Sequence, residues 1–273
     1  MQVVEANGAR IPIVGFGSMR LKQEAGVRVI AAALRIGYRH IDTAQAYENE
    51  REVGAAIRAS GVARDEIFLT TKVAWQRFKA EDLTRSVNES LERLGVSHVD
   101  LLLLHWPNPT VPLAETLGAL CKVKKAGLTR HIGISNFTLP LIEEAAKLSS
   151  EPIATHQIEV HPFIDRAKIV AASARHGMAI TAYCPIARGR VPGNETLARI
   201  GARHGKTAAQ VSLRWLVQQG IIVIPGTSKE ERVAENFAIL DFALSEAEMA
   251  EIAALARPDG RVVNPPHAPQ WDG

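Results

Sequence analysis

The chain has 273 residues, of which 47% are apolar and 22% charged, a composition typical of globular proteins that excludes a wholly disordered or fibrous chain. Lysine and arginine number 32 against 29 acidic residues, and the basic residues are scattered, which argues against a nucleic-acid-binding surface and favours small-molecule partners. Cys121 and Cys184 are too few for a disulfide framework, and no signal-peptide pattern or long apolar run occurs, so we expect a cytoplasmic protein without a membrane span.

The first predicted element is a β-hairpin. Residues 3–5 and 10–13 flank Asn7-Gly8, a dipeptide with a strong preference for two-residue hairpin turns. We expect this hairpin to cover the floor of the fold that follows.

Eight short apolar runs then alternate with segments of helical periodicity, the pattern of parallel βα units. In one such segment Leu83, Val87, Leu91 and Leu94 share a face. The spacing of roughly 30 residues per unit suits a strand, a crossover helix and two loops. The sequence therefore predicts an α/β fold, a (β/α)8 TIM barrel. The runs are residues 13–16, 38–41, 67–71, 99–104, 130–134, 153–156, 179–182 and 221–224.

A doubly wound sheet is the structural alternative. That fold would be expected to open with Gly-x-Gly-x-x-Gly between a strand and a helix, but Gly15-Phe16-Gly17-Ser18-Met19-Arg20 lacks the third glycine. From Arg257 onward the chain is proline-rich and without periodicity, which predicts an irregular tail over the surface. No linker divides the sequence, so we expect one domain over residues 1–273.

Polar side chains follow most of these runs, at the point where each predicted strand ends. Because active sites of such barrels lie at the carboxyl ends of the strands, we expect them on one rim. Taken singly, each has an ordinary explanation, such as a loop carboxylate or a core histidine. An acid, a phenol, an amine and an imidazole at consecutive strand ends together predict a catalytic site. In chain order the residues are Asp42 and Tyr47, Lys72, His105, Ser135 and Asn136, Gln157, and Tyr183.

Several segments resemble the signatures of the aldo-keto reductases. The resemblance runs from the hairpin into the tail and is strongest to the bacterial 2,5-diketo-D-gluconate reductases, whose ending is similar to Ala268-Pro269-Gln270-Trp271-Asp272. It implies a barrel, a nicotinamide cofactor and catalysis by Asp42, Tyr47, Lys72 and His105. The segments are Asp42-Thr43-Ala44 with Tyr47, Thr71-Lys72, Leu104-His105-Trp106-Pro107 and Gly133-Ile134-Ser135-Asn136-Phe137.

The chemistry of carbonyl reduction fits these four residues. Tyr47 would give the proton to the carbonyl oxygen, and Lys72 would stabilise the phenolate, because a free phenol has a pKa near ~10. Asp42 is the candidate counter-ion of Lys72, and His105 would hydrogen-bond the substrate oxygen. We also expect Asn49 to cap the helix after Tyr47, with Glu52 completing a capping box.

The resemblance also implies a cofactor site. Ser135, Asn136 and Gln157 would hold the nicotinamide carboxamide, and Tyr183 would stack on the ring. The segment Ile224-Pro225-Gly226-Thr227-Ser228 and the following helix resemble the family's adenosine-phosphate site, with Pro225, Thr227, Ser228, Arg232, Glu235 and Asn236 as candidate contacts.

The expected cofactor is NADPH, although this phosphate segment departs from the common pattern. Many relatives carry lysine where this chain has Gly226, so Lys229 is a possible substitute, and restoring the lysine would be expected to strengthen NADPH preference. A loop that binds a sugar phosphate substrate is the alternative reading of this segment.

Trp75 and Trp106 are candidate walls of the substrate pocket, with Phe163 and the tail around Trp271 narrowing its entrance. The short loops and polar tail favour small activated carbonyls, such as 2-oxoaldehydes and diketo sugar acids, over steroids. A monomer is compatible with the sequence.

Three alternatives to a reductase stay open. The first is a cofactor-retaining regulatory protein with little turnover, like the family's channel-associated β subunits. The second is Schiff-base chemistry at Lys72, which would require a depressed pKa. The third is a metal site, but no His-x-His pair or other ligand spacing supports one, so no metal is expected.

Overall fold

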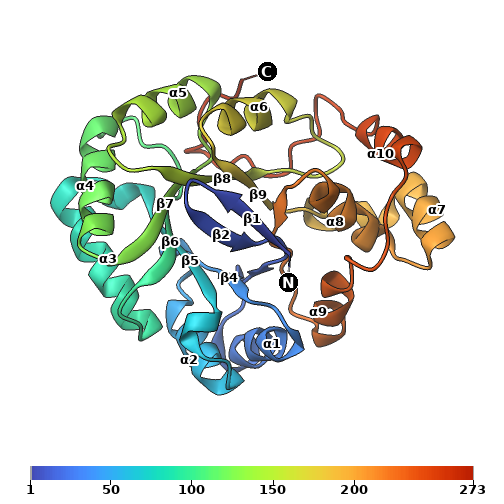
Figure 1. Ribbon diagram of the computed structural model, residues 1–273, viewed down its shortest axis with the longest axis horizontal. Helices are drawn as coiled ribbons and strands as arrows, with labels where there is room; N and C mark the ends of the chain where they lie inside the picture. The colour runs from blue at the N-terminus through green and yellow to red at the C-terminus, as the bar shows by residue number, and fades with distance from the viewer. Residues whose placement is uncertain (1, 273) are drawn as a thin grey trace.

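Eight parallel strands form the centre of the computed structural model, which describes residues 2–272. Each strand pairs with its sequence neighbour, and the order in the sheet is consecutive from β3 to β10. Figure 1 labels β4 to β9 of this sheet. Hydrogen bonds between the segment just before β3 and strand β10, Gly15 N to Val223 O and Val223 N to Ile13 O, close the sheet into the predicted (β/α)8 barrel. The strands are β3 (Phe16–Gly17), β4 (His40–Asp42), β5 (Phe68–Val73), β6 (Val99–Leu104), β7 (Thr129–Ser135), β8 (Ile153–Glu159), β9 (Ala179–Tyr183) and β10 (Ile222–Val223).

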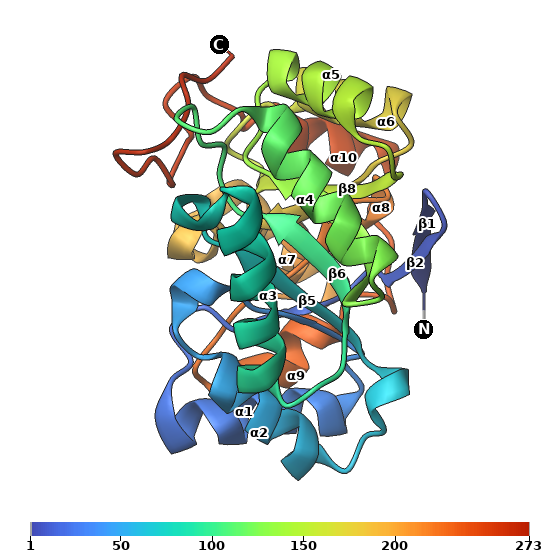
Figure 2. The same cartoon turned by 90° about the vertical axis from the view of Figure 1, so that its left-hand side faces the viewer.

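Helices surround the barrel (Figures 1 and 2). Their buried apolar residues belong to the same core cluster as residues of the strands. In α3, the predicted face of Leu83, Val87, Leu91 and Leu94 is buried. The α-helices are α1 (Gln23–Ile36), α2 (Glu50–Ser60), α3 (Ala80–Leu94), α4 (Leu113–Lys125), α5 (Leu139–Leu148), α6 (Ala167–Arg175), α7 (Glu195–His204), α8 (Ala208–Gln218), α9 (Glu230–Phe237) and α10 (Glu246–Ala253). The 3-10 turns are η1 (Gln45–Tyr47), η2 (Arg64–Glu66), η3 (Trp75–Arg77), η4 (Ala187–Gly189) and η5 (Val191–Gly193).

The predicted hairpin is present as β1 (Val3–Ala6) and β2 (Ala9–Pro12). Its turn residues Asn7 and Gly8 have φ of 47° and 84°, as a two-residue hairpin turn requires. Asn7 Nδ2 donates to Ile153 O at the start of β8 and to His176 O three residues before β9. Ile11 packs with Leu101 and other interior strand residues, so the hairpin closes the floor of the barrel.

Strand lengths differ from the prediction in a consistent way. Lys72 lies within β5, Ser135 ends β7 and Gln157 lies within β8, although the sequence suggested that these residues follow their strands. A barrel strand is hydrogen-bonded to a neighbour on both edges. Its backbone pairing therefore continues through polar residues whose side chains point inward, and the strand is longer than its apolar run. The first and last strands are shorter than predicted, because the barrel closes there through single bridges.

The chain after α10 is irregular, as its prolines predicted, and it is anchored by buried contacts. Glu159, at the end of β8, accepts hydrogen bonds from Val262 N and Val263 N at 2.6 and 3.0 Å. Arg257 N donates to Phe163 O. The tail is thereby held at the carboxyl end of β8. Across residues 2–272, no helix has the length and apolar character needed to cross a membrane.

Two buried histidines, His40 and His156, make the stability of the fold depend on pH. Burial lowers the pKa of His40 to about 4 and that of His156 to about 3. His156 Nε2 accepts a hydrogen bond from Phe137 N, which requires that nitrogen to be unprotonated. Because the unfolded chain binds these protons near pH ~6.5, the stabilisation is complete above that pH and is lost as the pH falls toward each folded-state pKa.

We therefore expect unfolding to become easier between pH 7 and pH 5, by about 2 kcal/mol for each ring. Urea titration at the two pH values measures this change. The His156→Gln variant, although less stable at pH 7, should lose less stability over the same interval. A pH-independent unfolding free energy in the unmodified protein would contradict the assignment.

Candidate active site

Side chains from β4, β5 and η1 meet at the carboxyl end of the barrel. Lys72 Nζ donates to Asp42 Oδ1 at 2.5 Å, to Thr43 O at 2.9 Å and to Tyr47 Oη at 3.3 Å. The ammonium is fully buried and all three of its hydrogens have an acceptor. Lys72 therefore has no open direction for attack on a carbonyl carbon, which disfavours the Schiff-base alternative on geometric grounds.

The electrostatics of this cluster follow from its burial. Burial lowers the pKa of the Lys72 ammonium, and the Asp42 carboxylate opposes that shift. Burial, together with the charge of Asp42, raises the pKa of the Tyr47 phenol well above its usual value. The phenol therefore keeps its proton at neutral pH and sits beside a group that can stabilise the phenolate once the proton leaves.

His105 follows β6 and faces the same space. Its ring lies 5.6 Å from that of Tyr47 in an edge-on arrangement. Burial lowers the pKa of His105 well below 6.5, and Lys72 and His267 reinforce the shift. The imidazole is therefore neutral at physiological pH and has one N–H to donate. The structure brings all four predicted catalytic residues to one rim.

The predicted nicotinamide contacts lie next to this cluster. Asn136 Nδ2 donates to His105 O and to Ser135 Oγ, and Tyr183 Oη donates to Asn136 Oδ1 at 2.7 Å. Gln157 Nε2 donates to Asp42 Oδ2 at 2.8 Å. Within residues 2–272, Gln157 Oε1 forms no hydrogen bond. An acceptor at Gln157, a hydroxyl donor at Ser135 and the flat Tyr183 ring together fit a carboxamide-bearing aromatic ring.

The predicted phosphate segment lies between β10 and α9, after the carboxyl end of β10 and next to β3. Ser228 and Arg232 are exposed, Thr227 is half-buried, and Thr227 Oγ1 accepts from Lys229 N near the start of α9. Exposed hydroxyls and cations at a helix N-terminus fit an anionic group. Among the other predicted contacts, Glu235 Oε1 accepts a hydrogen bond from Thr207 Oγ1 at 2.8 Å, and Pro225 and Asn236 are buried.

Position 226 has no room for a side chain in this conformation of the loop. A Cβ on Gly226 would lie 2.7 Å from Gly17 O, closer than backbone and side chain can approach. The loop is drawn to this strand by the hydrogen bond from Gly17 N to Pro225 O. A lysine at 226 would therefore require the loop to shift away from Gly17 O, and the prediction that it strengthens NADPH preference carries this structural cost.

Both predicted pocket tryptophans lie against one residue that the sequence did not single out. His267 stacks on Trp75 and packs edge-on against Trp106, with ring centroids 5.3 Å apart in both pairs. Trp271 also contacts Trp106, and the Arg261 guanidinium lies 3.7 Å above the Trp271 ring. Residues of the tail thus pack against both predicted pocket tryptophans. The tail sequence has no periodicity, so these contacts could not be predicted from it.

The predicted capping box at α2 is wrong. Asn49 occupies the N-cap position, but its side chain does not bond the helix backbone. Its amide donates to Ser18 O and Leu21 O, and its oxygen accepts from Thr43 Oγ1. These loop groups are buried with Asn49 and require partners, so the side chain ties the β3–α1 loop to the base of η1.

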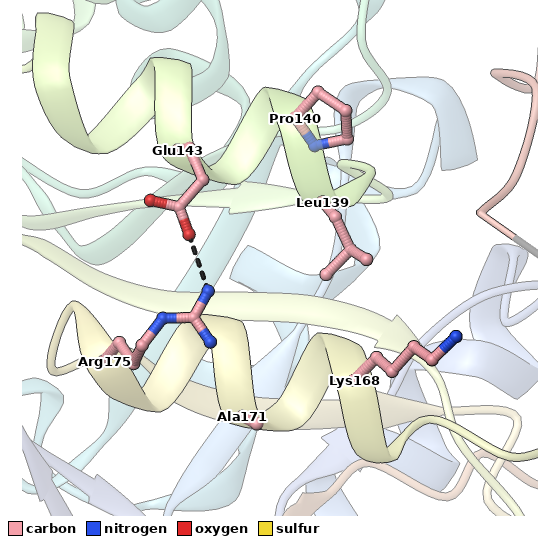
Figure 3. Close-up of a pocket in the computed structure, with 6 residues that line it drawn as sticks. All are labelled: Leu139, Pro140, Glu143, Lys168, Ala171 and Arg175. Atoms are coloured by element: carbon pink, nitrogen blue, oxygen red, sulfur yellow. Dashed lines mark hydrogen bonds and ion pairs between the residues drawn. The ribbon is translucent and has the colours of Figure 1, made fainter.

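Other surface features lie apart from this rim. A groove of about 470 Å³ between α5 and α6 is lined by none of the predicted site residues, and its Glu143 pairs with Arg175 (Figure 3). No group of three or more potential metal ligands occurs among residues 2–272.

Known proteins are similar to this chain in both sequence and fold. The aldo/keto reductase family model matches residues 13–257. Methylglyoxal reductase DkgB of Escherichia coli O157:H7 is 44% identical over 266 residues, which cover 96% of this chain and 99% of that protein. A crystal structure provisionally described as a 2,5-diketo-D-gluconic acid reductase B is 53% identical with a TM-score of 0.98, covering 100% of this chain and 98% of its own.

A more distant structure was determined with a nucleotide. Bombyx mori aldo-keto reductase in complex with NADP is 31% identical with a TM-score of 0.87, covering 93% of this chain and 92% of its own. The matches extend over nearly the whole barrel, including the strands that carry the four residues at the rim. The chain therefore belongs to the aldo/keto reductase family.

Proposed function

We propose that this protein reduces aldehydes and ketones to alcohols with NADPH as the hydride donor. The observation that carries the proposal is the contact of Tyr47 Oη with Lys72 Nζ beside a neutral His105. A protonated phenol, a cation to stabilise its conjugate base and a hydrogen-bond donor are the groups that carbonyl reduction requires. The names of the relatives, methylglyoxal reductase and diketo-gluconic acid reductase, support the same chemistry.

The reaction is divided between cofactor and protein. Bound NADPH supplies a hydride to the carbonyl carbon. Tyr47 donates its phenolic proton to the carbonyl oxygen, and Lys72 stabilises the phenolate that forms. Asp42 keeps the buried ammonium charged through the 2.5 Å contact. His105, as a neutral imidazole, donates an N–H to the carbonyl oxygen and orients it toward Tyr47.

The cofactor site would use two groups of residues, one on β7, β8 and β9 and one in the segment after β10. Ser135, Asn136 and Gln157 would hold the carboxamide and Tyr183 the face of the ring, next to Tyr47 and His105. Thr227, Ser228 and Arg232 would bind the 2′-phosphate, with Lys229 beside them. Exposed Arg232 is the best candidate for phosphate selectivity, since a guanidinium can bind phosphate bidentately.

The Arg232→Ala variant is accordingly expected to raise the KM for NADPH about tenfold or more and to leave the KM for NADH nearly unchanged. Because the residue is remote from the reacting atoms, kcat with saturating NADPH should stay near that of the unmodified enzyme. Steady-state kinetics with both cofactors measure this, and Arg203→Ala on α7 is a matched surface control. Equal use of both cofactors, unaffected by Arg232→Ala, would mean that the phosphate contact is elsewhere.

The aromatic residues expected to line the substrate pocket support a substrate class. Trp75, Trp106 and His267 form a compact aromatic group with a polar imidazole at its centre, and the proline-rich tail closes one side. Such a mouth suits small polar carbonyls, and a second carbonyl next to the first raises intrinsic reactivity, so fewer contacts are needed. We infer 2-oxoaldehydes and diketo sugar acids as substrates.

The test of the proposed function is an NADPH oxidation assay with four carbonyls at one cofactor concentration. We expect kcat/KM to rank methylglyoxal and a diketo-gluconate above benzaldehyde, and a ketosteroid last. A ketosteroid that exceeds the others would overturn the substrate class. The absence of turnover with every carbonyl would overturn the reductase itself.

A further inference from the structure

Gln45 connects the turn that carries Tyr47 to two other elements. Its Nε2 donates to Ser86 O, Ser86 Oγ and Ser90 Oγ on α3, at 3.0 to 3.1 Å. Its Oε1 accepts from Ala74 N at 2.9 Å, two residues beyond Lys72. A single amide thus fastens η1 to helix α3 and to the end of β5.

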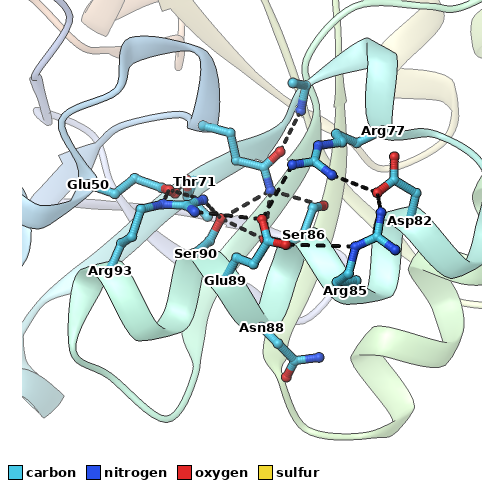
Figure 4. Close-up of polar contacts among 12 residues, drawn as sticks. Glu50, Thr71, Arg77, Asp82, Arg85, Ser86, Asn88, Glu89, Ser90 and Arg93 are labelled. Carbon is cyan, nitrogen blue, oxygen red and sulfur yellow. Dashed lines mark hydrogen bonds and ion pairs between the residues drawn. The ribbon is translucent and has the colours of Figure 1, made fainter.

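Glu50, the first residue of α2, connects the segment after Tyr47 to β5 and α3. Its carboxylate is 2% exposed and accepts from Thr71 Oγ1 at 2.6 Å and from Arg93 Nε at 2.8 Å (Figure 4). Thr71 directly precedes Lys72, and Arg93 lies on α3. The charge of Glu50 also helps Asp42 to keep the pKa of Lys72 from falling further with burial.

The two connections lie on either side of the reacting pair in the sequence. Gln45 and Glu50 stand two residues before and three residues after Tyr47. Their partners Ala74 and Thr71 stand two residues after and one residue before Lys72. Both side chains reach the same helix, α3. The Tyr47 Oη to Lys72 Nζ distance of 3.3 Å is already at the long end for a hydrogen bond, so a small displacement of η1 would break the contact.

We propose that Gln45 and Glu50 are positioning residues that use α3 as a common base to set the distance between the Tyr47 phenol and the Lys72 ammonium. The inference rests on the proposed function, since it concerns the geometry of the same proton transfer. A displacement of about 1 Å between reacting groups can lower a rate about 100-fold, so loss of either connection should slow the chemical step without touching the cofactor contacts.

The decisive variant is Gln45→Met, which keeps the side-chain length but removes every amide hydrogen bond. In a stopped-flow single turnover of the NADPH complex with methylglyoxal, we expect the rate constant to fall about 10- to 100-fold. The Kd for NADPH, from fluorescence quenching, should stay that of the unmodified protein. The readout separates positioning from folding, because a purely structural defect lowers the amplitude or the Tm but leaves the rate constant of the remaining folded molecules unchanged.

Two further variants make the test independent of how Gln45→Met folds. The double variant Ser86→Ala/Ser90→Ala keeps Gln45 but removes two of its partners, and alanine favours the helix, so it should fold and show a smaller fall. Arg85→Ala is the control. It removes the ion pairs that Arg85 makes with Asp82 and Glu89 on the same helix, and Arg85 bonds neither Gln45 nor Glu50 (Figure 4). Its rate constant should be unchanged.

The possible outcomes separate the two proposals. A rate constant equal to that of the unmodified enzyme in Ser86→Ala/Ser90→Ala, and in Gln45→Met where it folds, would overturn the positioning role and leave the reductase intact. An unmodified protein that does not oxidise NADPH with methylglyoxal or any other carbonyl would overturn the reductase, and the positioning role with it.

Discussion

The Tyr47→Phe variant is expected to reduce carbonyls about 100- to 10,000-fold more slowly than the unmodified enzyme, the range that a general acid contributes. Burial raises the pKa of the phenol above its usual value, which already keeps it protonated at neutral pH, and its Oη lies 3.3 Å from Lys72 Nζ. Phenylalanine keeps the ring and its packing against His105 but supplies no proton. The loss should appear in kcat, with the Kd for NADPH nearly unchanged.

Tyr183→Phe is the matched control for this prediction. It also removes one phenolic hydroxyl, which here donates to Asn136 Oδ1 at the proposed carboxamide site. We expect that variant to raise the KM for NADPH more than it lowers kcat. Turnover close to normal in Tyr47→Phe would remove this residue from the mechanism.

The Lys72→Met variant is expected to lose both activity and stability. Asp42 is 1% exposed, and without the ammonium its carboxylate keeps only the hydrogen bond from Gln157 among its side-chain contacts described above. Removing one partner of a buried ion pair destabilises proteins by about 3–5 kcal/mol, because the remaining charge is buried without compensation. Urea unfolding measures the stability, and NADPH oxidation measures the activity.

The double variant Asp42→Asn/Lys72→Met separates the two effects. It removes the uncompensated charge, so we expect most of the lost stability to return. Activity should not return, because the phenolate that forms at Tyr47 still has no cation beside it. A double variant as active as the unmodified enzyme would contradict the role of Lys72, and a stable single variant would contradict the buried pair.

Residues on regular strands could be placed from the sequence. Asp42, Lys72, His105 and Gln157 were predicted on one rim because apolar runs with helical segments between them define a barrel, and a barrel has a single carboxyl end. The strands of Asp42, Lys72 and Gln157 extend further than predicted, whereas β6 ends at Leu104 as predicted, and all four side chains still lie at the same rim. The signature segments added the chemistry of each position.

Residues whose roles depend on contacts between distant segments could not be predicted in this way. Asn49 has the sequence context of a helix cap, but burial of the Ser18–Leu21 carbonyls redirects its side chain. The close approach of Gly17 O to position 226 is invisible in a sequence that shows only a missing lysine. His267 and Gln45 stand in segments without periodicity, so only the folded chain reveals which residues they meet.

The central claim is that Tyr47, beside Lys72, delivers a proton while bound NADPH reduces a carbonyl. The most direct measurement is a stopped-flow trace of the preformed NADPH complex mixed with methylglyoxal, for the unmodified protein and for Tyr47→Phe. We predict oxidation of the bound NADPH at about 1 s⁻¹ or faster in the unmodified protein and at least about 100-fold slower in the variant. Bound NADPH that persists for minutes in the unmodified protein would contradict the claim and favour a regulatory protein that retains its cofactor without turnover.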